Sequence, residues 1–78
     1  MKTHIMHTPL LGKLYLVPHL VEEVPADRVF GYVDFGDDTR LVQGFWLGKG
    51  WLDSTGKPFS QPIVHWYHLE RPDGTSPF

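Results

Sequence analysis

The stretch IVHWYHL at residues 63–69, with Pro62 before it and Pro72 after it, decides the fold of this 78-residue chain. It is the densest run of β-branched, aromatic and large aliphatic side chains in the sequence, and these residue types are enriched in strands. Proline cannot donate a hydrogen bond to a neighbouring strand, so the two prolines mark where a strand begins and stops. We therefore predict that this segment is the strand on which the others pack, with Trp66 in the core.

Working outward, other runs of apolar and β-forming residues predict further strands, separated by turn residues. These strands cover residues 13–17, 28–35, 39–47 and 51–53. The turns contain Gly, Asp and Ser, which are typical of chain reversals. Between the first two of these strands, Pro18 and Pro25 leave room for one helical turn at most.

The spacing of the turns predicts the fold class, which is mainly β. No helical pattern is long enough to cross between parallel strands, so we expect a single small antiparallel meander of four to five strands, forming an open barrel-like or curled sheet. Residues 1–78 are read as a single domain, because a chain this short supports only one core. We expect residues 72–78 to be a loosely ordered end, and residues 1–9 to be either another such end or a short edge strand.

Composition excludes several classes of protein. The chain has no cysteine, which excludes disulfides and thiolate metal sites and indicates a reducing compartment such as a bacterial cytoplasm. The net charge of −2 comes from scattered charges, so we expect no general nucleic-acid binding. No stretch approaches the roughly 20 apolar residues of a membrane span, and no targeting segment is recognised at the start.

Three pieces of sequence stand in an order that resembles a known family. They are LV at 16–17 ahead of VPAD at 24–27, YVD at 32–34 followed by GFW and GWLD up to residue 53, and PIVHW at 62–66 running to LERP at 69–72. Over residues 14–72 this order resembles the short phage and prophage proteins catalogued as domain of unknown function 551. The closing motif carries over at His65, Trp66, Leu69 and Pro72, and departs at Val64, Tyr67, His68 and Glu70. The resemblance implies a phage-encoded accessory protein of β-rich fold, acting in the host cytoplasm, and brings no activity.

Two histidine pairs have the spacing His-x-x-His, at residues 4–7 and 65–68. Four imidazoles can hold zinc, but side chains three apart in a strand point to opposite faces of the sheet. We therefore expect no metal and no cofactor, with one of His65 and His68 facing the core and the other exposed. Asp34, Asp37 and Asp38 are likewise interpreted as turn residues rather than a cation site.

The aromatic side chains suggest how the protein acts. If Trp46 and Tyr67 share the face opposite the core, they form an exposed platform of the kind that marks a binding surface. The predicted binding residues are Trp46, Tyr67, Arg40, His65 and Arg71. No hydrolase or phosphate-binding motif is present, so we expect no enzyme.

Two functions follow from this interpretation. The first is stoichiometric binding to a host protein, as an inhibitor or adaptor. The alternative is a small-ligand binding or sequestering protein that self-associates, in which aromatic rings stack on the ligand and His65, Arg40 or Arg71 meets an anion. A metal-dependent enzyme built on the histidines ranks below both.

Overall fold

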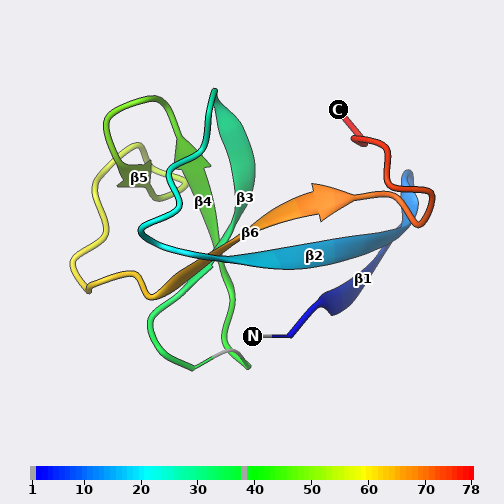
Figure 1. The fold of residues 1–78 in the computed structure, drawn as a ribbon, viewed down its shortest axis with the longest axis horizontal. Helices are drawn as coiled ribbons and strands as arrows, with labels where there is room; N and C mark the ends of the chain where they lie inside the picture. The colour runs from blue at the N-terminus through cyan, green and yellow to red at the C-terminus, as the bar shows by residue number, and fades with distance from the viewer. Residues whose placement is uncertain (1, 38) are drawn as a thin grey trace.

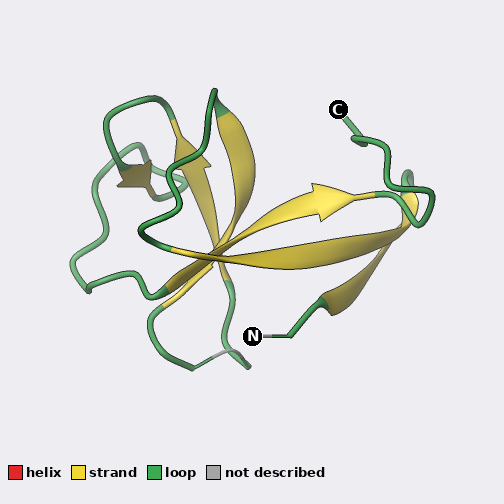
Figure 2. Cartoon of the chain, viewed as in Figure 1, coloured by secondary structure: helices red, strands yellow, loops and turns green. Residues whose placement is uncertain are grey.

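A computed structural model describes residues 2–37 and 39–78 of the chain. These residues form six strands and no helix, and therefore contain no helix able to span a membrane (Figure 2). The strands are β1 (His4–Thr8), β2 (Gly12–Leu20), β3 (Val29–Asp34), β4 (Val42–Trp46), β5 (Trp51–Leu52) and β6 (His65–Glu70). The all-β prediction is confirmed. In the segment between β2 and β3, where one helical turn at most was expected, the Glu23 amide donates to the Leu20 carbonyl and forms a turn.

All six strands belong to one antiparallel sheet with the order β1-β2-β6-β3-β4-β5 (Figure 1). The predicted meander of four to five strands is wrong, because β6 returns from the end of the chain and inserts between β2 and β3. The sheet is also neither closed nor strongly curled, so the barrel-like form is not adopted. The segment that was expected to organise the chain does so by pairing with strands on both sides.

Alternation along β6 gives the sheet two apolar clusters, one on each face. One face, here called the tyrosine face, carries the buried residues Leu16, Tyr67 and Leu69. The opposite face, called the tryptophan face, carries the buried residues Val33, Trp51 and Trp66. The prediction that Trp66 lies in the core is confirmed, since 5% of its surface is exposed.

Strand β2 passes through Pro18, although this proline was expected to end the strand at Val17. The pairing of β2 with β1 stops at Leu16, whereas its pairing with β6 continues through Pro18 to Leu20. Beyond Leu16 the β1 side of β2 therefore has no partner strand, and an edge of this kind tolerates a residue without an amide hydrogen. The strand consequently extends far enough to bring His19 beside β6.

Both ends of the chain contact the rest of the molecule. Residues 4–8 form the edge strand β1, which was one of the two alternatives expected for this segment. In the tail, Pro77 is buried and the ring of Phe78 packs edge-on against Phe30 at 5.5 Å between centroids. The C-terminal residues therefore form part of the wall beside β3 and β6.

Candidate functional site

The platform predicted from Trp46 and Tyr67 does not form, because the two side chains lie on opposite faces of the sheet. Tyr67 is 1% exposed and belongs to the cluster on the tyrosine face. Trp46 is half-buried and packs against the cluster on the tryptophan face, 5.7 Å from the ring of Trp51. Val33 pairs with both Trp66 and Val42, so these three side chains share one face of the sheet. Trp46 follows Val42 by four residues in β4 and therefore lies on the same face.

The two predicted arginines lie in separate exposed turns. The side chain of Arg40 is 87% exposed, with its Nε 3.8 Å from the Asp37 carboxylate. Arg71 begins a turn in which its amide donates to the Thr75 carbonyl at 2.9 Å. Asp37 accepts hydrogen bonds from the following turn, and Asp38 lies outside the described residues. The predicted binding residues are therefore not brought together into one site.

A first polar network lies on the tyrosine face around Asp34, whose side chain is fully buried. The Tyr67 hydroxyl donates to Asp34 Oδ2 at 2.5 Å, and the Gly36 amide donates to Oδ1 at 3.0 Å. His65 Nδ1 lies 3.2 Å from both carboxylate oxygens. These contacts join the end of β3 to the beginning of β6.

The same contacts keep Asp34 ionised inside the protein. Burial by itself would raise the pKa of Asp34, but hydrogen bonds from Tyr67, Gly36 and His65 outweigh it, so the pKa lies below its ordinary value. A buried carboxylate with several donors satisfies the requirement that buried charge be hydrogen-bonded. Because Asp34 is fully buried and accepts several hydrogen bonds, this network stabilises the junction of β3 and β6.

A second polar network lies on the tryptophan face and reaches the surface. It is a chain of four side chains, Glu23, His19, His68 and Glu70. His19 Nδ1 lies 2.5 Å from Glu23 Oε2, and His19 Nε2 lies 2.6 Å from His68 Nδ1. His68 Nε2 lies 2.8 Å from Glu70 Oε2. The chain thus joins β2 to β6, with the Glu23 carboxylate supplied by the loop after β2.

Trp66 holds one end of this second network in place. Its ring stacks on the His19 ring with centroids 4.1 Å apart and an interplanar angle of 16°. Its indole Nε1 donates to the Glu23 carbonyl at 2.7 Å. Since Trp66 is itself fixed by the core, it positions both the ring of His19 and the loop that carries Glu23.

The two histidines of the His-x-x-His segment in β6 therefore serve different networks. His65 contacts Asp34 on one face, whereas His68 contacts His19 and Glu70 on the other. The two side chains lie on opposite faces of the sheet, as the alternation along the strand predicted. Among the residues that the structure describes, no group of three or more His, Asp or Glu side chains is arranged to hold a metal ion.

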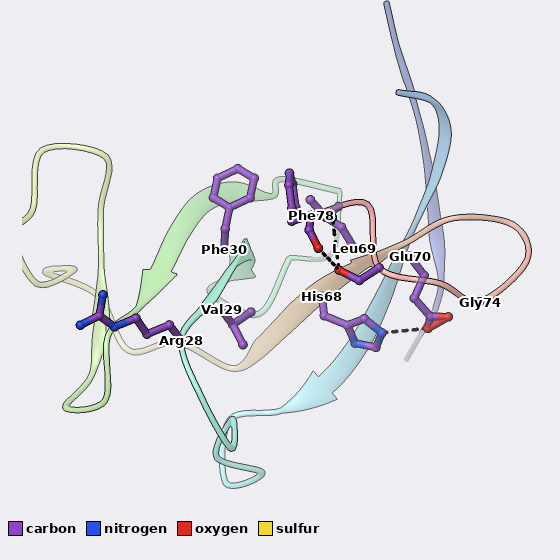
Figure 3. A pocket seen from close by; sticks show the side chains of 9 residues that line it. Arg28, Val29, Phe30, His68, Leu69, Glu70, Gly74 and Phe78 are labelled. Carbon is purple, nitrogen blue, oxygen red and sulfur yellow. Dashed lines mark hydrogen bonds and ion pairs between the residues drawn. The ribbon is translucent and has the colours of Figure 1, made fainter. Parts of the chain in front are cut away.

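A hollow of about 520 Å³ opens where β3 and β6 separate. The two strands pair from Asp34↔His65 to Gly31↔His68 and diverge beyond that point, as Figure 1 shows. The tail of the chain borders the fork. The hollow is lined by Arg28, Val29, Phe30, His68, Leu69, Glu70, Gly74, Ser76 and Phe78. Figure 3 shows the rings of Phe30 and Phe78 together on one side, while the guanidinium of Arg28 extends away from the other lining side chains.

A third feature is the tip of the β1–β2 hairpin, at Pro9, Leu10 and Leu11. Leu10 is 96% exposed and Leu11 is 40% exposed. The turn is nevertheless well defined, because the Thr8 hydroxyl donates to the Gly12 carbonyl at 3.1 Å and accepts from the Leu11 amide at 2.9 Å. Gly12 has a φ of +74°, a conformation that other residues rarely adopt. The turn therefore presents an apolar side chain to solvent on a backbone of defined conformation.

Sequence reasoning missed both the second network and the hairpin tip. His19 and Glu23 belong to a segment read as a loop, and only the extension of β2 past Pro18 brings His19 beside His68. Two adjacent leucines between Pro9 and Gly12 could have indicated the hairpin tip. Instead, Leu10 and Leu11 were interpreted as the apolar residues that lead into the first strand. Comparison of the chain with protein-family models, curated proteins and solved structures finds no match.

Proposed function

We propose that the protein is a non-catalytic binding protein that forms a stoichiometric complex with a partner protein through the tip of its β1–β2 hairpin. The observation that carries the proposal is the 96% exposure of Leu10 on a hydrogen-bonded turn. Large apolar side chains exposed in isolation are common on protein surfaces. Leu10 differs because it is followed by another exposed leucine, and because the turn fixes its backbone before any partner binds.

The geometry of the hairpin supports recognition by a partner. Fully burying a leucine side chain contributes about 1.5–3 kcal/mol, and a turn whose backbone is already formed loses little backbone entropy on binding. Strand β1 is also an edge of the sheet, so its outer backbone groups can pair with a strand of another chain. Ile5 on β1 is 56% exposed and extends the apolar surface along that edge. This mode of binding is compatible with an accessory role of the kind implied by the phage protein family that residues 14–72 resemble.

Quantitative affinity capture from a bacterial lysate, followed by titration with the purified partner, tests the proposal. The wild-type chain is compared with the double variant Leu10→Ser, Leu11→Ser and with the control Leu47→Ser, which alters an exposed leucine in the β4–β5 loop. We expect one partner to be lost with the double variant and kept with the control, and the recombinant partner to saturate at one molecule per chain. A partner retained equally by all three proteins, or an effect on the partner that continues with turnover, contradicts the proposal.

A second candidate function is the binding of a small ring-shaped ligand in the hollow between β3 and β6. The rings of Phe30 and Phe78, whose centroids lie 5.5 Å apart, form an aromatic wall, and Ser76 is a polar residue of the lining. Aromatic walls with a few polar groups are typical of small-ligand sites. Screening a library of aromatic carboxylates by NMR, with Phe78→Ala as the variant that removes the wall, distinguishes this function from the first. Shifts confined to the hollow and lost in Phe78→Ala favour it, whereas the hairpin variants leave such binding unchanged.

A further inference from the structure

The two nitrogens at the centre of the second network face each other across a gap of 2.6 Å, from His19 Nε2 to His68 Nδ1. The other nitrogen of each ring lies against a carboxylate, Glu23 in one case and Glu70 in the other. An ionised carboxylate only accepts hydrogen bonds, so each of these outer nitrogens carries a proton. Both rings therefore direct their remaining lone pairs into the same gap.

At this distance the two nitrogens are hydrogen-bonded to each other, so in the metal-free protein one proton lies between them. The arrangement is also the one found around metal-bound histidines, in which the ring nitrogen remote from the metal donates to a carboxylate that orients the ring and raises its basicity. Two such rings, each with its own carboxylate, converge here on one point.

We propose that His19 and His68 form a binding site for one divalent transition-metal ion, with Glu23 and Glu70 orienting the two ligands. The ion displaces the shared proton, which passes to solvent, so that one proton is released for each ion bound. Glu23 and Glu70 are positioning residues in this site, since they contact the ligand rings and not the ion.

Binding an ion requires a wider gap and a turn of both rings. Zinc–nitrogen bonds of about 2.0–2.1 Å in tetrahedral geometry place two ligand nitrogens about 3.3 Å apart, so the gap has to widen by roughly 0.7 Å, and each ring has to turn until its lone pair points at the ion. The side chains of His19 and His68 are 20% and 32% exposed, so both rings can turn outward toward solvent. Their exposure also leaves the remaining coordination positions open to water.

The donor set determines the class of ion. Imidazole suits Zn²⁺, Cu²⁺ and Ni²⁺, whereas Mg²⁺ and Ca²⁺ prefer oxygen ligands. Among these ions Cu²⁺ binds a given nitrogen site most tightly. The two nearby carboxylates add favourable negative charge without occupying the coordination positions of the ion.

Trp66 provides a reporter, because its ring stacks directly on His19. Untagged protein is titrated with Cu²⁺ while tryptophan fluorescence is recorded, and with Zn²⁺ by calorimetry in two buffers of different ionisation enthalpy. We expect one ion per chain, strong quenching by Cu²⁺, and release of one proton per Zn²⁺. The variants Glu23→Gln and Glu70→Gln should each weaken binding by about tenfold, the usual effect of removing a carboxylate that orients a ligand.

Matched variants separate this site from the other histidines. His68→Ala should abolish quenching, whereas His7→Ala, at an exposed position on β1, should leave binding unchanged. Circular dichroism establishes that each variant is folded, and Glu23→Gln provides a second test because the Glu23 side chain is 62% exposed and supports no core contact. Absence of saturable binding, binding that persists in His68→Ala, or binding without proton release overturns the proposal. In those cases the contact between the histidines is a shared proton only.

Discussion

Gly31 is the residue at which the fold should be least tolerant of an added methyl group. It is the last residue of β3 to pair with β6 before the strands diverge, and a Cβ atom built there would lie 2.1 Å from the backbone oxygen of Tyr67. Carbon–oxygen contacts of this kind are normally about 3.3–3.6 Å, so Gly31→Ala has to move one strand by more than about 1 Å. The atom in the way is backbone, and no side-chain rotation relieves the contact.

The cost follows from what that movement disrupts. Overpacking typically costs about 1–3 kcal/mol, and loss of backbone hydrogen bonds between β3 and β6 adds about 1 kcal/mol for each bond. We therefore expect Gly31→Ala to lower the free energy of unfolding by about 3 kcal/mol or more. In a domain of this size that corresponds to a fall in Tm of more than about 12 °C.

The measurement is thermal and urea unfolding followed by circular dichroism. Gly50→Ala is the matched control, because a Cβ atom at Gly50 meets nothing within 4 Å and its φ is not positive. This control should be neutral or slightly stabilising, since alanine loses less backbone entropy on folding than glycine. If Gly31→Ala melts within a few degrees of the wild type, β3 and β6 are not as close as the structure shows.

Three further predictions concern the networks and the core. The pKa of Asp34 is lowered in the folded protein, so the ionised carboxylate stabilises the fold fully above its unfolded pKa of about 3.9, and this stabilisation is lost as the pH falls through the folded pKa. A plot of the urea midpoint against pH should therefore fall at acid pH for the wild type and fall less for Asp34→Asn. Asp27→Asn, at an exposed carboxylate, should behave as the wild type. Tyr67→Phe removes a hydrogen-bond donor from the buried Asp34 carboxylate and should lower the free energy of unfolding, measured with urea, by about 1–3 kcal/mol. The control Tyr32→Phe removes a hydroxyl that donates to the Met6 sulfur, and should lower it far less. Equal losses in the two variants would contradict the role of the first network. Trp66→Ala should cost about 3–5 kcal/mol and prevent folding, and a cooperative melt near that of the wild type would show that the indole is not in the core.

The sequence predicted the features that depend on local pattern. Residues 63–69 were identified as the central strand, which the structure has two residues later at its start, as β6 (His65–Glu70), and alternation along it correctly separated His65 from His68. The order of the strands was not predicted, because the insertion of β6 between β2 and β3 depends on pairing between segments some 50 residues apart, which leaves no mark on either segment alone. The four-to-five-strand meander assumed instead that neighbours in sequence are neighbours in the sheet.

The candidate site was harder to predict for a related reason. Tyr67 was assigned with Trp46 to an exposed aromatic platform, yet its hydroxyl donates to a buried carboxylate 33 positions away. Nothing in the local sequence shows that Asp34 is buried, since Asp-Phe-Gly-Asp is also ordinary turn sequence. A buried polar side chain is compatible with the core only when its partner is known, and that partner comes from the tertiary structure.

Strand β6 links the two networks, and this constrains its register. His65 and Tyr67 direct their polar groups to the buried Asp34, while His68 and Glu70 complete the chain at the surface. A slip of one residue would exchange the faces of every side chain in the strand, placing the Glu70 carboxylate against the apolar tyrosine face and Tyr67 on the tryptophan face, away from Asp34. Because the buried carboxylate would then lose its donors, the slipped register carries the penalty of an unpaired buried charge in addition to lost apolar contact. The polar side chains of β6 therefore specify its pairing as strongly as its apolar ones, and the same alternation that prevents His65 and His68 from sharing an ion leaves His68 free to act with His19.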